Sequence, residues 1–225
     1  MHTNSHNSPN ATPNVTPIET SVFKLCDIAE IRIGHPFRGT IKPNDKGDAH
    51  VIQVRDAEVS GQINPSGLIK TALTTKKQPD WLQDGDMLFI AKGAKHHSAL
   101  VDGQLIKNMG ERVLCSPHFF VVRVKPEFEE SILPEFICWQ LNQIPAQRYF
   151  KATAEGSMYL SIRRQVLEDV PIKVLSLEKQ TQLTAMHRCS VKEQSALQRL
   201  IENRQQQLDA IALQALLTTN EFKKI

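Results

Sequence analysis

The chain has 225 residues, of which 40% are hydrophobic, so it has room for one ordinary domain with an appendage and enough apolar side chains for a buried core. The 27 Lys and Arg against 24 Asp and Glu leave a net charge of +3, so overall charge does not indicate a nucleic-acid partner and only clusters of cations could. The four cysteines are scattered, no apolar run approaches the ~20 residues of a membrane span, and the N-terminus lacks the charged-then-apolar order of a signal peptide. These features argue against a disulfide framework and a membrane protein, and a reducing, cytoplasmic location is expected.

Four segments are expected along the chain. A disordered tail over 1–20 precedes a folded domain over 21–175, a long helix over 176–217 and a short tail over 218–225. The first of these is made of Asn, Thr, Pro, Ser and His with few large apolar side chains, and such a composition cannot offset the entropy lost on ordering.

The first two thirds of the folded domain is predicted to be rich in strands. Apolar residues follow a period of two over 28–33, which is typical of a half-buried strand. The Asp-Gly-Asp turn at 84–86 leads into a buried strand over 87–91. Another strand starts at Ser98, and the short basic loop between these two strands gives a shape that can enter a groove. A further strand is expected over 50–56, and residues 113–124 carry another, with Phe119–Val122 at its centre.

Two short helices are predicted after the strands. The first covers 133–142, with Pro134 near its first turn, where proline fits. The second covers 161–169, with Ser161 as its cap and two arginines in its first turn. Together with the strands they predict an α/β (α+β) fold built on a mixed sheet and followed by one long C-terminal helix.

The long helix is predicted because residues 177–217 contain neither Pro nor Gly, a length well beyond the roughly 11–12 residues of an average helix. Ser176, with Gln180 four positions later, resembles a loose capping box at its start. Two interpretations stay open: a helix that lies across its own domain, or an interaction helix that needs a partner. One row with alternating three–four spacing suits pairing with another helix, and its polar members, among them His187, can fix register. The apolar members of this row are Leu183, Leu197, Ile201, Leu208 and Ile211.

Motifs that carry catalysis are absent from the sequence. It has no Gly-rich phosphate loop, H-E-x-x-H, G-x-S-x-G or paired-cysteine motif. It also lacks the Asn/Asp-Pro-Pro-aromatic tetrapeptide of amino-methyltransferases and the carboxylate–lysine set that holds Mg²⁺ in many nucleases. Asp84 and Asp86 are interpreted as turn residues, and the adjacent His96 and His97 lack a third metal ligand. We therefore expect no catalytic residue and no metal site.

Cationic and polar residues gather instead in several loops and helix ends. The stretch from Arg148 to Arg164 is the most basic, with four cations and one anion. Each cluster alone is typical of a solvated surface, but clusters that converge on one face would form a concavity that contacts phosphates. The candidate DNA-binding residues are Arg38, Lys42, Lys92, Lys95, His96, His97, Lys107, Arg112, Arg148, Ser157, Tyr159, Arg163 and Arg164.

A series of short segments carries a family resemblance. They are individually weak motifs that become specific through their order: 25–34, 37–41, 51–56, 82–93, 116–120, 133–136, 154–157 and 167–180. In that order they are similar to the target-recognition domain of type I restriction-modification specificity (S) subunits and to the junction that leads into the family's long helix. The resemblance covers about Phe23 to Leu217.

The resemblance implies a fold and a function. The family's domain docks on double-stranded DNA and recognises one half of a split target, while its long helix packs against a second long helix and supports methyltransferase (M) subunits. It implies a subunit without catalytic residues or a cofactor of its own. S-adenosylmethionine, Mg²⁺ and ATP would belong to the M subunits and, where present, a restriction (R) subunit.

The chain departs from the family pattern because an S subunit usually carries two recognition domains and two helices. This departure implies a half-subunit that forms a homodimer or pairs with another S chain, or else an exchangeable fragment. The proline-rich junction of the family is also replaced here by Val174-Leu175-Ser176. A second functional class stays open: an assembly or anti-restriction module of the same fold that does not recognise DNA.

Overall fold

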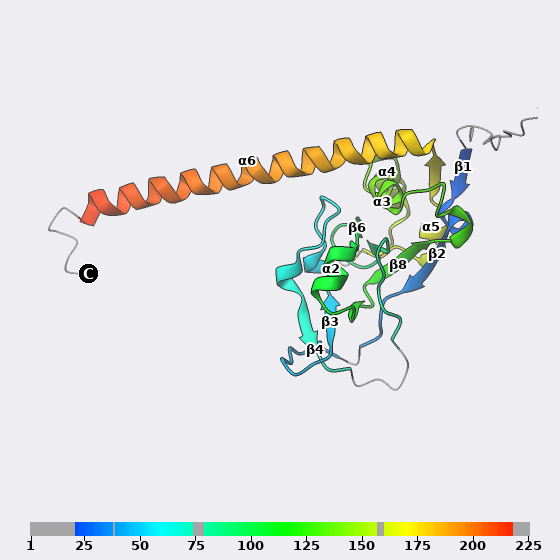
Figure 1. Ribbon diagram of the computed structural model, residues 1–225, viewed down its shortest axis with the longest axis horizontal. Coiled ribbons are helices and arrows are strands. Elements are labelled where there is room, and N and C mark those ends of the chain that lie inside the picture. The colour runs from blue at the N-terminus through cyan, green and yellow to red at the C-terminus, as the bar shows by residue number, and fades with distance from the viewer. Residues whose placement is uncertain (1–20, 38, 74–78, 157–159, 218–225) are drawn as a thin grey trace, which may run out of the picture.

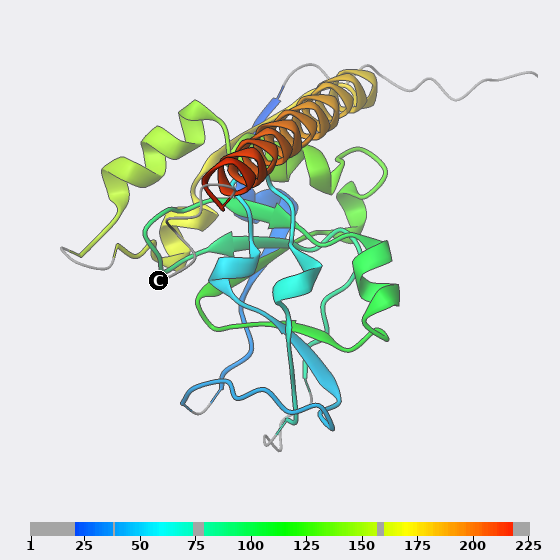
Figure 2. The same cartoon turned by 90° about the vertical axis from the view of Figure 1, so that its left-hand side faces the viewer.

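The computed structural model describes residues 21–37, 39–73, 79–156 and 160–217. Figure 1 shows an α/β domain with one long helix, α6 (Leu177–Leu217), that extends far beyond it. In Figure 2 the view runs nearly along α6, and the domain lies to one side of the helix. The predicted α/β fold with a long C-terminal helix is confirmed, whereas the tails predicted over 1–20 and 218–225 lie outside the described residues.

A four-stranded antiparallel sheet forms the centre of the domain. Its order is β2 (Ala29–Ile33), β8 (Phe119–Val124), β5 (Met87–Ile90), β6 (Ser98–Leu100). All four residues of β5 are buried. Because successive side chains of a strand point to opposite faces, Met87 and Phe89 enter one hydrophobic core while Leu88 and Ile90 enter the other. The strands predicted over 28–33, 87–91 and from Ser98 are therefore confirmed.

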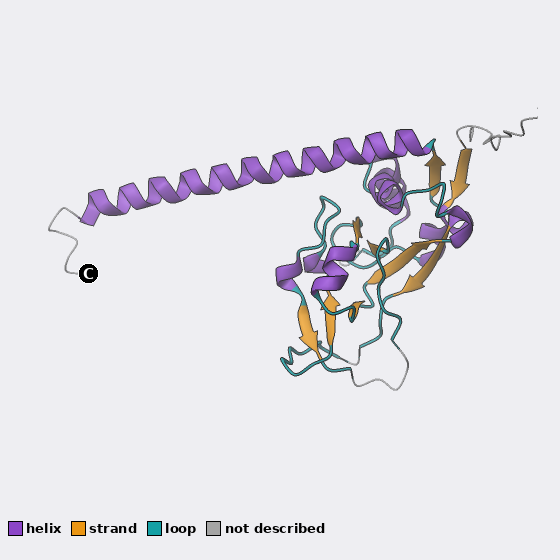
Figure 3. Cartoon of the chain, in the orientation of Figure 1, coloured by secondary structure: helices purple, strands orange, loops and turns teal. Residues whose placement is uncertain are grey.

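A second sheet of three strands packs beside the first. It has the order β4 (Ile69–Thr71), β3 (Ala49–Ile52), β7 (Val113–Cys115), with β3 and β7 parallel. The strand predicted over 50–56 is shorter than expected, because the chain passes into the 3-10 helix η1 (Val54–Asp56). Figure 3 places this sheet at the end of the domain away from α6.

The strand predicted within 113–124 is confirmed as β8, but the residues before it form a separate strand, β7, which belongs to the other sheet. Pro117 has no N–H to continue a ladder, and Phe119 N–H donates to Ser116 O (3.2 Å) in a turn between the two strands. Gly34 lies against this turn. A Cβ at Gly34 would overlap the Ser116 carbonyl, so only glycine fits there.

Of the short helices, α3 (Pro134–Leu141) is the one that packs against α6 (Figure 1). The predicted helix over 133–142 is confirmed as α3, with proline at its start. The helix predicted over 161–169 is α5 (Arg164–Glu168), and the Ser161 cap is wrong, because Ser161 is bridged to Glu155 and Arg163 occupies the N-cap position. The sequence did not predict α1 (Leu25–Ile28), α2 (Gly103–Asn108), α4 (Ile144–Thr153) or the 3-10 helices η2 (Pro65–Gly67) and η3 (Pro126–Phe128).

The start and the end of the domain meet in a two-stranded antiparallel sheet formed by β1 (Ser21–Lys24) and β9 (Pro171–Val174). Two amide side chains at the end of α3 occupy free strand edges. Gln140 accepts from Lys173 N (3.0 Å) and donates to Lys173 O (2.9 Å), while Asn142 makes the same pair of bonds with Ser98, both at 2.8 Å. Each side-chain amide makes the two hydrogen bonds that a peptide group of a neighbouring strand would make. The outer edges of β9 and β6 are therefore covered at these positions by residues at the end of α3.

Candidate nucleic-acid interface

The loop 92–97 connects β5 to β6 and lies against the chain that enters α5. Lys92 and Ser161 form an isolated bridge, and Ile162 N–H donates to Ala91 O (2.9 Å). These main-chain contacts join two basic stretches that are separated by about seventy residues in the sequence. The hairpin loop predicted from the sequence is therefore not isolated but is fixed to a second loop.

Four cations gather at this junction, and we name them the hairpin cluster: Lys92, Lys95, Lys151 and Arg163. Lys95 and Lys151 line the same cavity of about 420 Å³. All four side chains are exposed, and Arg163 forms an ion pair with Glu155 (2.7 Å). Arg148 lies three residues before Lys151 on α4 and is also exposed, so both side chains occupy the same face of that helix. The structure thus brings together cations that lie in separate clusters in the sequence.

His96 and His97 do not belong to this exposed surface. Their rings are buried, with His96 Nδ1 2.9 Å from Ile90 O and His97 Nε2 3.1 Å from Ala57 O. Since a carbonyl oxygen can only accept, each ring nitrogen named here carries the hydrogen. Burial lowers the pKa of His97 below its ordinary value, and Lys95 and His96 lower it further, against the opposite effect of the bond to Ala57. These two candidate DNA-binding side chains are thus buried inside the domain, where their hydrogen bonds fix the conformation of the loop.

The other candidate cations lie elsewhere on the domain. Arg112 borders the three-stranded sheet, where it pairs with Asp48 (2.9 Å) and lies over the Trp81 ring. Lys42 is near the same sheet, because its carbonyl accepts from Thr71 Oγ1 (2.9 Å). The remaining two are Lys107, exposed on α2, and Arg164, paired with Glu168 on α5 (2.7 Å). Arg38, Ser157 and Tyr159 lie outside the described residues.

The Asp-Gly-Asp turn has a structural role, as predicted. Asp86 is fully buried and forms two hydrogen bonds of 2.6 Å with the Arg123 guanidinium. It also accepts from Gln83 N (2.8 Å), which closes the turn. Hydrogen bonding to Asp86 raises the pKa of Arg123. Among the described residues, no group of three His, Cys, Asp or Glu side chains could hold a metal ion.

The first turns of α6 are fixed to the domain by Gln180, which is fully buried. Its side chain accepts from Leu133 N (2.9 Å) and donates to Ser131 O (2.8 Å) and Leu175 O (2.7 Å). One amide thus joins the helix, the strand that precedes it and the loop before α3. The sequence placed Gln180 only in the capping motif, because nothing in residue order shows that a polar side chain on a helix is fully buried.

Two further contacts hold the next turn of α6. His187 Nε2 lies 3.2 Å from Ser60 O, and Arg188 pairs with Glu135 on α3 (3.5 Å). His187 was predicted to lie in the row that pairs with another helix, but it contacts its own domain instead. The direction in which α6 leaves the domain is therefore set by contacts at Gln180, His187 and Arg188.

Beyond Val191 every described side chain of α6 is exposed. This part includes four of the five predicted pairing residues, with exposed fractions of 53% for Leu197, 63% for Ile201, 53% for Leu208 and 63% for Ile211. Leu183, close to the domain, is half-buried. The interpretation in which the helix lies across its own domain is therefore wrong for most of its length. No described helix is long and apolar enough to cross a membrane.

The chain is similar in structure to type I restriction-modification (R-M) proteins. It superposes on the S subunit from M. genitalium with a TM-score of 0.57 and 15% identity, over 96% of this chain and 50% of that one. The HsdS subunit from Thermoanaerobacter tengcongensis gives 0.54 and 16%, over 95% and 52%. A chain from a structure describing complex assembly and conformational transition of the type I R-M system gives 0.58 and 13%, over 91% and 46%. No family model and no curated protein matches the sequence.

The chain therefore has the fold of type I R-M S subunits, and the resemblance drawn from short motifs is confirmed at the level of fold. It spans about half the length of the solved structures that it matches. In architecture it corresponds to one half of an S subunit, with one α/β domain followed by one long helix.

Proposed function

We propose that this chain is a non-catalytic, sequence-specific DNA-recognition subunit of a type I R-M complex, and that its domain recognises one half-site. The observation that carries the proposal is the likeness of more than nine tenths of the chain to S subunits. The hairpin cluster supports it, because exposed cations on neighbouring loops provide the sequence-independent attraction to phosphates that most DNA-binding proteins use. Phosphate contacts position a protein on the duplex, and polar side chains of the same loops then recognise base edges.

The way in which the loop 92–97 is held suits this role. Its two buried imidazoles bond to main-chain carbonyls, and Gln147 on α4 donates to His96 O (2.7 Å). A loop fixed before binding loses less conformational entropy when it meets its ligand. Lys92 and Lys95 are therefore presented on a rigid support.

The long helix has a separate role in the proposal. Its exposed apolar row pairs with a second long helix, from another copy of the chain or from another S chain, and the pair supports M subunits. S-adenosylmethionine, Mg²⁺ and ATP are then bound by the M and R partners. Two copies would bring together two recognition domains, and their target would be a palindrome with a fixed gap.

DNA recognition is tested by charge reversal in the hairpin cluster. With the M subunit present, the chain should enrich one sequence from a pool of duplexes at moderate salt, and Lys92→Glu with Lys95→Glu should abolish binding while M binding stays intact. Lys173→Glu, an exposed lysine on β9, is the matched control and should bind normally. The absence of any enriched sequence would refute DNA recognition, and retained M binding would then favour the assembly or anti-restriction module.

Helix pairing is tested by charge on the apolar row. Leu197→Lys with Ile201→Lys should yield a monomer in light scattering, because a lysine pair at these positions would bury charge in the interface. Asn203→Lys with Gln206→Lys is the control. Gln206 lies nine residues after Leu197, which at 3.6 residues per turn places it on the opposite side of the helix. If the mass in solution is the same for both double variants, this row does not mediate pairing.

A further inference from the structure

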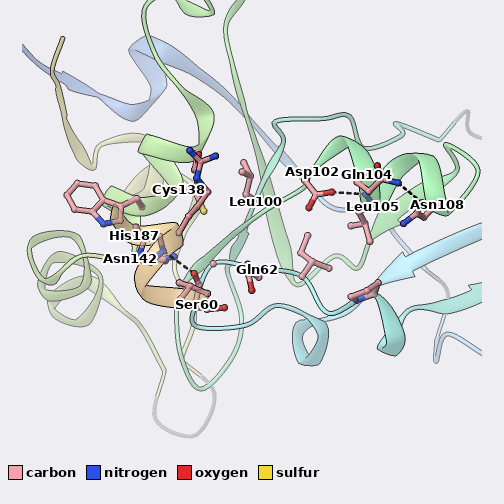
Figure 4. Close-up of a pocket in the computed structure, with 17 residues that line it drawn as sticks. Ser60, Gln62, Leu100, Asp102, Gln104, Leu105, Asn108, Cys138, Asn142 and His187 are labelled. Carbon is pink, nitrogen blue, oxygen red and sulfur yellow. Dashed lines mark hydrogen bonds and ion pairs between the residues drawn. The ribbon is translucent and has the colours of Figure 1, made fainter. Parts of the chain in front are cut away.

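A groove of about 550 Å³ lies between the first turns of α6 and the domain. Figure 4 shows that its wall includes His187 of α6 and that Ser60, Gln62, Leu100 and Cys138 of the domain face the same space. Apolar surface predominates in its lining, and α3 contributes the half-buried side chain of Trp139. The groove thus offers an apolar floor beside a helix that has an exposed apolar row.

One face of α6 has three parts along its length: it is buried against the domain at the start, polar and exposed in the middle, and apolar and exposed at the end. At the start of the helix this face contacts the domain through Gln180 and Thr184, which are both buried. Leu216 follows Gln180 by 36 residues, which is ten turns at 3.6 residues per turn, so it lies on the same face. Leu213 lies one turn before Leu216. Their exposed fractions are 61% for Leu213 and 56% for Leu216.

Between these two ends the same face is polar. It carries Gln198, Glu202, Gln205 and Asp209, whose side chains bond to one another in pairs, Gln198 to Glu202 (2.9 Å) and Gln205 to Asp209 (2.8 Å). A face that is polar in the middle is suited to water, whereas the leucines at its far end are suited to a protein surface. The apolar row for helix pairing, centred on Leu197 and Ile201, lies about a quarter turn away and does not account for these leucines.

The symmetry of an antiparallel pair explains such a pattern. A two-fold axis that relates two antiparallel helices runs perpendicular to the plane containing them, so both domains lie on the same side of that plane. The face of α6 that contacts its own domain at one end therefore looks toward the partner's domain at the other end. Leu213 and Leu216 occupy that position.

We propose that the last two turns of α6 from a second copy of the chain dock, through Leu213 and Leu216, into the groove beside Trp139 and His187. Placing Leu216 beside His187 puts the two-fold axis close to Ile201, near the middle of the exposed apolar row. This inference rests on the helix pairing proposed above and is independent of DNA recognition.

The test is a photo-crosslink in the full chain. A benzophenone side chain at Leu216, in a mixture of isotope-labelled and unlabelled copies, should crosslink to loop 60–65 or to α3 of the other copy, as identified by mixed-isotope peptides. The same side chain at Gln207, which lies on another face of the helix, is the control and should give none of these peptides. Leu213→Asp with Leu216→Asp should raise the dimer Kd at least about 30-fold, whereas Gln206→Asp with Gln207→Asp should change it less than about 3-fold.

The outcomes separate the two hypotheses. A dimer in which Leu216 crosslinks only to the partner's α6 overturns the docking but leaves helix pairing in place. A chain that stays monomeric at the concentrations used overturns both, and DNA binding by the M complex remains a separate measurement. Circular dichroism of each variant shows whether α6 is intact, and the crosslinks are recorded in chains that keep Leu213.

Discussion

Replacing Gln180 with alanine should detach α6 from the domain at a measurable cost in stability. The substitution removes three hydrogen bonds in a site with no solvent exposure and leaves Leu133 N–H, Ser131 O and Leu175 O without the amide. An unsatisfied buried group costs roughly 1–3 kcal/mol. Some of this cost is recovered when the space admits water, so we expect a total loss of about 3 kcal/mol.

Differential scanning calorimetry and small-angle scattering measure this loss. For a protein of this size, about 3 kcal/mol corresponds to a fall in Tm of roughly 6–12 °C. The scattering profile should also broaden, because the angle between α6 and the domain is no longer fixed. Gln182→Ala is the matched control, since Gln182 is exposed and its side chain donates to the neighbouring Glu178 of the same helix (3.3 Å). Equal Tm values for the two variants would show that the buried amide does not hold the junction.

Three further predictions concern buried groups. Asp86→Ala should lower the free energy of unfolding in urea by about 3–5 kcal/mol, because it leaves the Arg123 guanidinium without its partner. Lowering the pH should destabilise the domain through His97: its pKa is lower in the folded than in the unfolded chain, so its contribution is complete above the ordinary value of 6.5 and is lost as the pH falls through the folded value. In the native protein a thiol reagent should modify the exposed Cys189 and leave Cys115, whose pKa is raised by burial to about 12, unmodified.

Each of these predictions has a control in the same chain. Asp84→Ala removes the exposed carboxylate of the same turn and should cost less than about 1 kcal/mol. His97→Gln should flatten the stability profile below pH 6.5, whereas the same change at the exposed His118 should leave it unaltered; identical profiles for the two would contradict the assignment. Cys138, also buried with a pKa raised to about 12, should become reactive together with Cys115 only on unfolding.

Local patterns in the sequence were sufficient to predict those elements that are marked by their own residues alone. The alternation over 28–33, the turn before Met87 and the long stretch without Pro or Gly correspond to β2, β5 and α6. The failures have a common cause, because they depend on partners that are distant in the sequence. The strand Phe119–Val124 is mostly apolar, like the strand Val113–Cys115 before it. The two strands nevertheless belong to different sheets, because the turn at Pro117 separates them.

The candidate site shows the same division. Residue types predicted that Lys92 and Lys95 would be cationic and accessible, which the structure shows. They could not predict that His96 and His97, in the same loop, would be buried, since that depends on Ala57 and Ile90, which are supplied by other segments. Nor could they show that Lys151 and Lys95 line the same cavity, because this depends on the contact between α4 and the loop, where Gln147 donates to His96 O.

The two amides at the end of α3 have a consequence for how such a domain can diversify. Gln140 and Asn142 each imitate a neighbouring chain along a strand border that would otherwise invite intermolecular addition. The end of one short helix therefore covers two strand edges, and the side chains that cover them lie outside the hairpin cluster. Residues of the surface loops can then be substituted without opening either strand edge.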